Sequence, residues 1–346
     1  MRQLTIDLLP LVLMAGIMIA TLAIFWKLLD VVVLSVSAAV VLYPLHRYCS
    51  RSVNRYISAG IITVLLFVVF ISVVLASVSI VSSNSGILKE DVSAIQDWVD
   101  ASSGSSVFGL PIDREQVAAG FQKAEDLVSG YWNAILSEPV LIAFKIFVFF
   151  TSFSVFLLHG AAIYDRILTR VPAPLKGHVS TMSSVTVDTL YAIYVVHAGI
   201  SALTFVIAIP FFIFLGYGNV LFYSFLCGFC ELIPVLGSSA VFIFLGVLAL
   251  ATGDIRSLLF IIVFGYIGVA ALPEIYIRPV FMGRRVRIHP FVMFIGFIGG
   301  ILTLGMAGFV LGPVVIVLLF TGYSILLEEK KSHKRTGLRQ TSGSGE

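Results

Sequence analysis

The chain has 346 residues, of which 59% are hydrophobic and only 12% are charged. Soluble proteins carry about 25% charged residues. With a mean hydropathy of +1.05, this much apolar surface cannot be hidden in one aqueous core, so a water-soluble globule is excluded and an integral membrane protein is indicated. The net charge of +3 is small and the basic residues are dispersed among apolar runs. Nucleic-acid binding is therefore excluded, and the lipid bilayer is the expected partner.

Region 1–82 contains three apolar runs, at 8–25, 28–45 and 60–81. A spanning helix needs about 20 apolar residues, so these runs predict transmembrane spans one to three. The first run follows Arg2 as in a signal sequence, but no small-residue cleavage site comes after it. We therefore expect this run to be kept as a membrane helix.

The next segment, 83–138, has nine acidic and three basic residues, which predicts a small insert outside the membrane. Apolar residues recur at helical spacing over 87–99 and again over 117–135. A stretch rich in Gly, Ser and Pro at 102–111 separates them. The pattern predicts two amphipathic helices in the insert.

The transmembrane core is predicted over 139–329, followed by a basic cytoplasmic tail at 330–346. Span four is expected at 139–158 and span five at 191–215, and the polar segment 160–189 between them is predicted to be a cytoplasmic linker.

Two later apolar runs, 220–251 and 290–327, are too long for one span each, and 257–277 lies between them as span seven. Pro234 and Gly237 interrupt the first run, which predicts two half-length helices that meet at a turn. The second run is interrupted by Gly299, Gly300, Gly305, Gly308, Gly312 and Pro313.

Of the 22 Lys and Arg residues, 16 lie at the N-terminus, in the tail or in three loops near the ends of spans. The positive-inside rule then places both termini in the cytoplasm and the acidic insert outside the cell membrane. Each broken run must enter and leave on one side. The predicted fold is thus an all-α integral membrane protein of about eight membrane segments, two of them broken hairpins of opposite polarity, with a small external helical insert.

Three motifs give the chain a resemblance to a known family: Glu-Leu-Ile-Pro-Val-Leu-Gly at 231–237, Ile-His-Pro at 288–290, and the glycine series from 299 to 313. With the order of spans, insert and linker, they make the chain similar to the autoinducer-2 exporter family of membrane transporters over nearly its whole length. The resemblance implies export of a small polar molecule or, as in some members, exchange of sodium for protons. It also implies that the protein forms a homo-oligomer, because the oligomers of this family resemble pentamers.

Charged residues inside apolar runs are expected to have a partner or a purpose, because each costs about 2.5–3.5 kcal/mol at the bilayer centre. Glu231 precedes Pro234 by three residues. Its carboxylate either takes part in transport or lies at a water-exposed helix end. Glu274 and Arg278 are one helical turn apart and either pair at the inner surface or take part in transport. Lys145 is expected to extend outward along its stem to water.

The sequence contains no catalytic motif, phosphate-binding loop or metal-spaced cluster, so we expect no enzyme, no ATP-driven pump and no cofactor. The predicted function is a secondary transporter, most simply an exporter of a small polar molecule. A sodium/proton antiporter, a channel-like oligomer and a membrane scaffold are the alternatives. The candidate transport and coupling residues are Glu231, Pro234, Gly237, Glu274, Arg278, Gly299, Gly300, Gly305, Gly308, Gly312 and Pro313.

The glycines also have a purely structural interpretation. Gly296 and Gly300, like Gly308 and Gly312, are spaced Gly-x-x-x-Gly, which permits close helix packing in a membrane. A transport site at the two breaks and a packing role are both compatible with the sequence. For His197, near the inner end of span five, we expect an interhelical hydrogen bond rather than proton transport.

Overall fold

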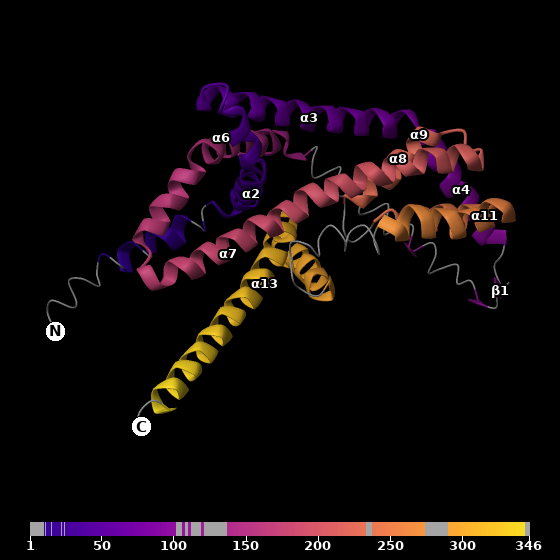
Figure 1. Cartoon of the computed structure of the whole chain (residues 1–346). Coiled ribbons are helices and arrows are strands. Elements are labelled where there is room, and N and C mark those ends of the chain that lie inside the picture. Colours follow the sequence, from indigo (N-terminus) through magenta and orange to yellow (C-terminus); the bar gives the residue numbers. More distant parts are fainter. Residues whose placement is uncertain are drawn as a thin grey trace. The chain divides into compact units, whose positions relative to one another are not determined.

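The computed structural model of the chain is mainly helical (Figure 1). It describes residues 26–101, 106–107, 110–111, 119–120, 137–232, 237–273 and 290–342, together with residues 10, 12–14, 16–21, 23 and 25. The chain forms two compact units. Unit 1 consists of Met1–Val64, Ala143–Leu190 and Ile288–Glu346, and unit 2 of Leu65–Ile142 and Tyr191–Arg287.

Unit 1 holds α2 (Trp26–Cys49), the start of α3 (Arg55–Ser83), most of α6 (Pro139–Arg170), nearly all of α7 (Ala173–Tyr191), and α13 (Pro290–Ser342). Helix α2 packs against α13. Its buried face consists largely of small residues such as Ser35 and Ala39, and small side chains let helices approach closely where lipid gives no hydrophobic drive.

Unit 2 holds the rest of α3, α4 (Ser85–Ala101), η1 (Ala192–Val196), α8 (His197–Leu215), α9 (Val220–Glu231), α10 (Ser239–Ala251), α11 (Ile255–Phe260) and η2 (Ile261–Ala271). Helix α8 ends at Leu215, and its C-cap residue Gly216 has a φ of 80°, which permits the left-handed cap and the tight turn into α9. Phe212 and Phe242 stack at 6.2 Å between ring centroids in the apolar core of this unit.

Among the residues that the structure describes, five helices are long and apolar enough to cross a membrane: Trp26–Cys49, Arg55–Ser83, Pro139–Arg170, Ala173–Leu215 and Phe291–Leu327. Shorter apolar helices lie at Val12–Thr21, Val220–Glu231, Ser239–Ala251 and Ile255–Ala271. The prediction of a helical, multi-pass membrane protein is confirmed at this level. The number of eight segments and the opposite polarity of the two broken runs stay predictions.

The local structure of several segments differs from what the sequence indicated. The polar segment 160–189 is helical, formed by the end of α6 and most of α7, with the helices separated at residues 171–172. Span five starts with the π-helical turn η1, and span seven is π-helical over η2. Hydropathy cannot reveal such wide turns, since they depend on side-chain packing rather than on the apolar period.

In the insert, the first predicted amphipathic helix is confirmed as α4, whose Ile95 and Val99 are buried in the core of unit 2. Within the predicted break, β1 (Ser106–Val107) pairs with β2 (Leu110–Pro111) as a short antiparallel hairpin. Of the second predicted helix, only residues 119–120 are described, and they are helical.

Candidate functional site

The first broken run forms two half-length helices, as predicted. Helix α9 ends at Glu231 and α10 begins at Ser239. Gly237, just before α10, is buried and has a φ of 55°, which favours glycine. Pro234 lies outside the described residues, as do Glu274 and Arg278.

Glu231 is the last residue of α9, and its side chain is 0% exposed. Its Oε2 accepts a hydrogen bond from the backbone N–H of Ser238 and another from the Ser238 hydroxyl, both at 3.0 Å. Ser238 is the N-cap of α10, where backbone N–H groups lack helical partners and the helix dipole favours negative charge. The carboxylate therefore ties the two half-helices together, and the alternative of a water-exposed helix end is wrong.

Buried polar groups extend from Glu231 along the contact between α8 and α9. We call this set the polar seam: His197, Ser201 and Thr204 on α8, and Ser224, Gly228 and Glu231 on α9. All of them are buried. In a unit whose core is otherwise apolar, such a row of polar groups is costly unless its members find partners.

One hydrogen bond between α8 and α9 fixes the register of the polar seam. The Ser201 hydroxyl donates to the carbonyl oxygen of Gly228 at 2.7 Å. A Cβ on Gly228 would lie 2.8 Å from the Cβ of Phe205, so glycine permits this close approach. Because the two helices are consecutive and antiparallel, one turn in one direction brings Thr204 level with Ser224. One turn in the other direction brings His197 level with Glu231.

Thr204 and Ser224 are each 0% exposed. Within the part of the chain that the structure describes, neither hydroxyl has a hydrogen-bond partner. Buried hydroxyls without partners usually bind an ordered water or a ligand. The polar seam can therefore bind a water molecule or a small polar ligand two helical turns from the Glu231 carboxylate.

The second broken run, α13, reverses direction at Gly305. Its φ of 61° and ψ of −138° lie in a region that only glycine adopts without strain. A Cβ built on Gly300 would overlap the carbonyl oxygen of Gly308, and one on Gly312 would overlap that of Gly296. The two arms thus pack backbone to backbone, with both Gly-x-x-x-Gly pairs at the contact.

The remaining residues of this series divide by environment. Pro313 is buried, and its N and Cα lie 3.1 Å from an ideal Cβ on Gly296. Gly299 is exposed and has nothing within 4 Å of an ideal Cβ. The structural role of Gly300, Gly308 and Gly312 is therefore close packing, and any further role in transport stays a prediction.

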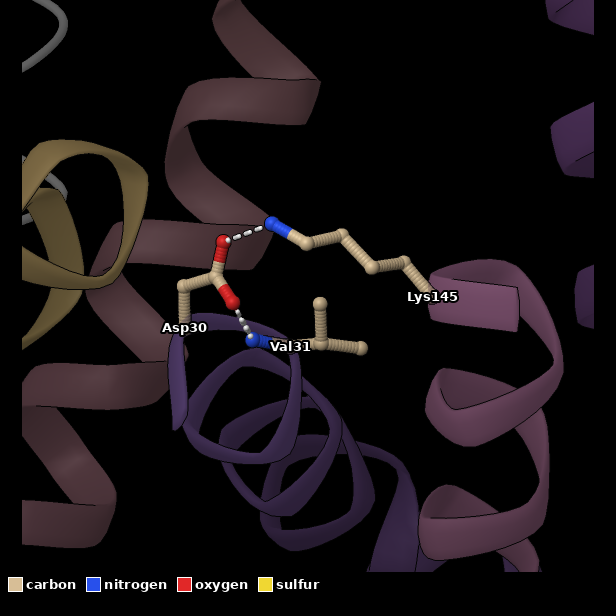
Figure 2. Close-up of polar contacts among 3 residues, drawn as sticks. All are labelled: Asp30, Val31 and Lys145. Atoms are coloured by element: carbon tan, nitrogen blue, oxygen red, sulfur yellow. Dashed lines mark hydrogen bonds and ion pairs between the residues drawn. The ribbon is translucent and has the colours of Figure 1, made fainter. Parts of the chain in front are cut away.

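Figure 2 shows an ion pair that the sequence did not indicate. The Lys145 Nζ lies 2.9 Å from Oδ2 of Asp30, and the other carboxylate oxygen of Asp30 accepts the N–H of Val31 at 2.8 Å. Lys145 lies in the second turn of α6 and Asp30 in the second turn of α2. Lys145 thus has a partner on another span while its side chain keeps 30% exposure, and its outward extension to water stays a prediction.

Sequence reasoning missed Asp30 as well as the hydroxyl members of the polar seam. An acidic residue in one apolar run and a basic residue in another were a usable signal for the pair. The serines and threonines gave none, because such residues commonly bond to the carbonyl of the preceding turn in membrane helices. No group of three or more His, Cys, Asp or Glu side chains that could hold a metal occurs among the described residues.

Comparison with known proteins agrees with a transport role. Residues 8–327 match the model of the AI-2E family transporter. A candidate transport protein of Methanocaldococcus jannaschii is 24% identical over 322 residues, which cover 91% of this chain and 95% of the relative. A second, from Methanothermobacter thermautotrophicus, is 30% identical over 186 residues, 53% of this chain and 55% of the relative.

Proposed function

Because the chain belongs to the AI-2E family of transporters, we propose that it is a secondary transporter that exports a small polar molecule across the cell membrane. The observation that carries this proposal is the α9–α10 break, where Glu231 is fully buried against the backbone N–H and the hydroxyl of Ser238, the N-cap of α10. A helix interrupted within the membrane leaves backbone groups unpaired. It is tolerated where protein, water or a transported solute replaces the lost bonds.

The polar seam supplies the remaining requirement of a solute site. It offers hydroxyl groups at one level and a carboxylate at another, on two helices that otherwise pack through apolar side chains. Polar groups inside a membrane protein generally face a bundle interior or a solute pathway. A small polar molecule with several hydroxyl or carbonyl groups fits this donor and acceptor set.

Sodium/proton exchange is the second candidate, and Glu231 favours it. Carboxylate, hydroxyl and backbone carbonyl oxygens are ligands for hard cations, and a carboxylate can alternatively take up a proton. Because sodium and a proton would compete for the same carboxylate, their transport is coupled without a second binding site. In this second function the same residue would alternate between cation and proton.

The orientation is part of the proposal: both termini in the cytoplasm and the insert of 83–138 outside. The Asp30–Lys145 pair supports it, because the two residues lie in the second turns of α2 and α6 and so bring the beginnings of two spans to the same level. Helices α2 and α6 then begin on one side, and their basic ends, with Arg47 and Arg170, lie on the other. A cysteine at position 105 should react with an impermeant reagent only from outside, and labelling only from the cytoplasm would contradict this topology.

Self-association into a homo-oligomer, a pentamer by family resemblance, completes the proposal. Mass measurement in mild detergent tests it. A monomer in every lipid and detergent would count against the oligomer but leave transport by a single chain possible.

Flux through the purified protein in liposomes tests the proposed function. We expect autoinducer-2 or sodium to cross faster than in protein-free vesicles and to respond to an imposed proton gradient. A flux that does not depend on the proton gradient and increases linearly with solute concentration would indicate a channel. An absence of flux for either solute, in vesicles where the protein is shown to be folded, would leave the scaffold alternative.

A further inference from the structure

The end of α2 and the turn that follows it form an open pocket of about 340 Å³, lined by Tyr43, Pro44, Arg47, Tyr48 and Arg51. The five residues recur about one helical turn apart, so they form a single stripe. Two arginines and two tyrosines thus line one small space. This pocket lies in unit 1, and none of its five lining residues is among the candidate transport residues.

The arginines of this loop differ in their partners. Arg55 donates to the hydroxyl of Tyr56 at 2.8 Å, and its guanidinium lies 4.8 Å from the centroid of the same ring. The guanidinium groups of Arg47 and Arg51 have neither a hydrogen bond nor an ion pair with any residue that the structure describes. Two cations that face one pocket without a counter-ion are expected to bind an anion.

The backbone around the pocket is held in place. The N–H groups of Ser50 and Val53 donate to the carbonyls of His46 and Cys49, at 2.8 and 3.2 Å. Nδ1 of buried His46 lies 3.0 Å from the hydroxyl of Ser58 on α3. The turn that carries Arg51 is therefore fixed to both flanking helices, so the backbone positions of the two arginines are set before any ligand binds.

We propose that this pocket, formed by Tyr43, Arg47, Tyr48 and Arg51, binds the phosphate of an anionic phospholipid headgroup. Arginine forms charge-assisted hydrogen bonds with phosphate oxygens, and basic pockets at the ends of membrane helices bind anionic headgroups.

The location of the pocket favours a lipid over a soluble anion. It directly follows an apolar span, whose Leu45 is 42% exposed beside the pocket. Tyr48 is 71% exposed, and tyrosines at the ends of spans belong to the headgroup level of a bilayer. A phospholipid can place its phosphate on the arginines while its acyl chains lie along α2, which a free phosphate ion cannot do.

The test compares the full-length wild type with two double variants in nanodiscs of phosphatidylglycerol or phosphatidylcholine. Arg47→Gln/Arg51→Gln removes two charges from the pocket. The control Arg166→Gln/Arg170→Gln removes two exposed charges at the end of α6. Native mass spectrometry counts retained lipid, and thermal unfolding measures stabilisation. We expect the affinity for phosphatidylglycerol to fall about 30-fold in the pocket variant, since each arginine near an anionic surface contributes about 1 kcal/mol, and to change little in the control.

Equal losses in both variants would overturn the proposal, because they would show only general attraction to negative lipid. Stabilisation by glycerol 1-phosphate equal to that by phosphatidylglycerol would also overturn it, in favour of a soluble anion. Arg51→Gln alone changes an exposed turn rather than a helix, and it should show the same selective loss if the double variant does not fold. Solute flux is measured in parallel, so failure of the lipid site can be told apart from failure of the transport proposal.

Discussion

Replacing Gly300 by alanine should force apart the two arms of α13. An ideal Cβ at this position lies 2.7 Å from the carbonyl carbon of Gly308 and 3.2 Å from the Cα of Gly312. Carbon atoms pack best at about 3.5–4.0 Å, so the arms must separate by roughly 1 Å. The atoms in the way belong to the backbone, which cannot turn aside as a flexible side chain can.

Overpacking of this kind typically costs about 1–3 kcal/mol. Alanine also removes some of the entropic cost of glycine in a helix, about 0.5–1 kcal/mol, which partly offsets the clash. Gly299→Ala is the matched control, because it makes the same change one residue away at an exposed position with nothing within 4 Å. The control should be neutral or slightly stabilising.

Fluorescence-detected size-exclusion chromatography after heating measures the difference between these variants. Gly300→Ala should lose its monodisperse peak at a lower temperature than wild type, and Gly299→Ala should not. If Gly300→Ala is as stable as Gly299→Ala, the backbone contact between the arms is absent in the protein, and the packing explanation of the glycine pairs is wrong.

Two further predictions concern polar contacts. Asp30→Asn removes the counter-ion of Lys145 and should lower the free energy of unfolding by about 1 kcal/mol. The swapped variant Asp30→Lys/Lys145→Asp should partly restore this stability. If a melting assay shows no recovery, the ion pair in Figure 2 does not form. Burial raises the pKa of Asp91 above its ordinary 3.8, with the Tyr223 hydroxyl at 2.7 Å opposing the shift. The Asp91 carboxyl then binds its proton more readily in the folded state than in the unfolded state. Its contribution to the free energy of unfolding is therefore fully present below pH 3.8 and is lost as the pH rises through the pKa of the folded state. Asp91→Asn should lose less thermal stability than wild type between acid and neutral pH, and an unchanged pH profile would contradict this assignment.

Hydropathy and charge were sufficient to predict the class of fold. Run length identified the spans, and Pro234 with Gly237 predicted the break between α9 and α10, because few residues other than proline and glycine interrupt an apolar helix. The acidic, periodic stretch at 87–99 predicted α4 for a similar reason. These features depend on local composition, which a sequence shows directly.

The contacts that build the site could not be predicted in the same way. Ser201 meets Gly228 across 27 residues, and Asp30 meets Lys145 across 115, so both depend on how helices are arranged in space. The glycines of α13 looked alike in sequence. Only the fold separates Gly305, which makes the turn, from Gly300, which makes the contact.

The proton dependence of flux in Glu231→Gln tests the central claim most directly. Glutamine keeps the size of the side chain and an oxygen that can accept from Ser238, but it cannot titrate or carry the charge. Glu90→Gln, an exposed carboxylate on α4, is the matched control. In liposomes loaded with equal amounts of folded protein, Glu231→Gln should flatten the pH profile of solute or sodium flux while the control keeps the wild-type profile. A Glu231→Gln variant with the wild-type rate and pH profile would contradict the proposal that this buried carboxylate couples transport.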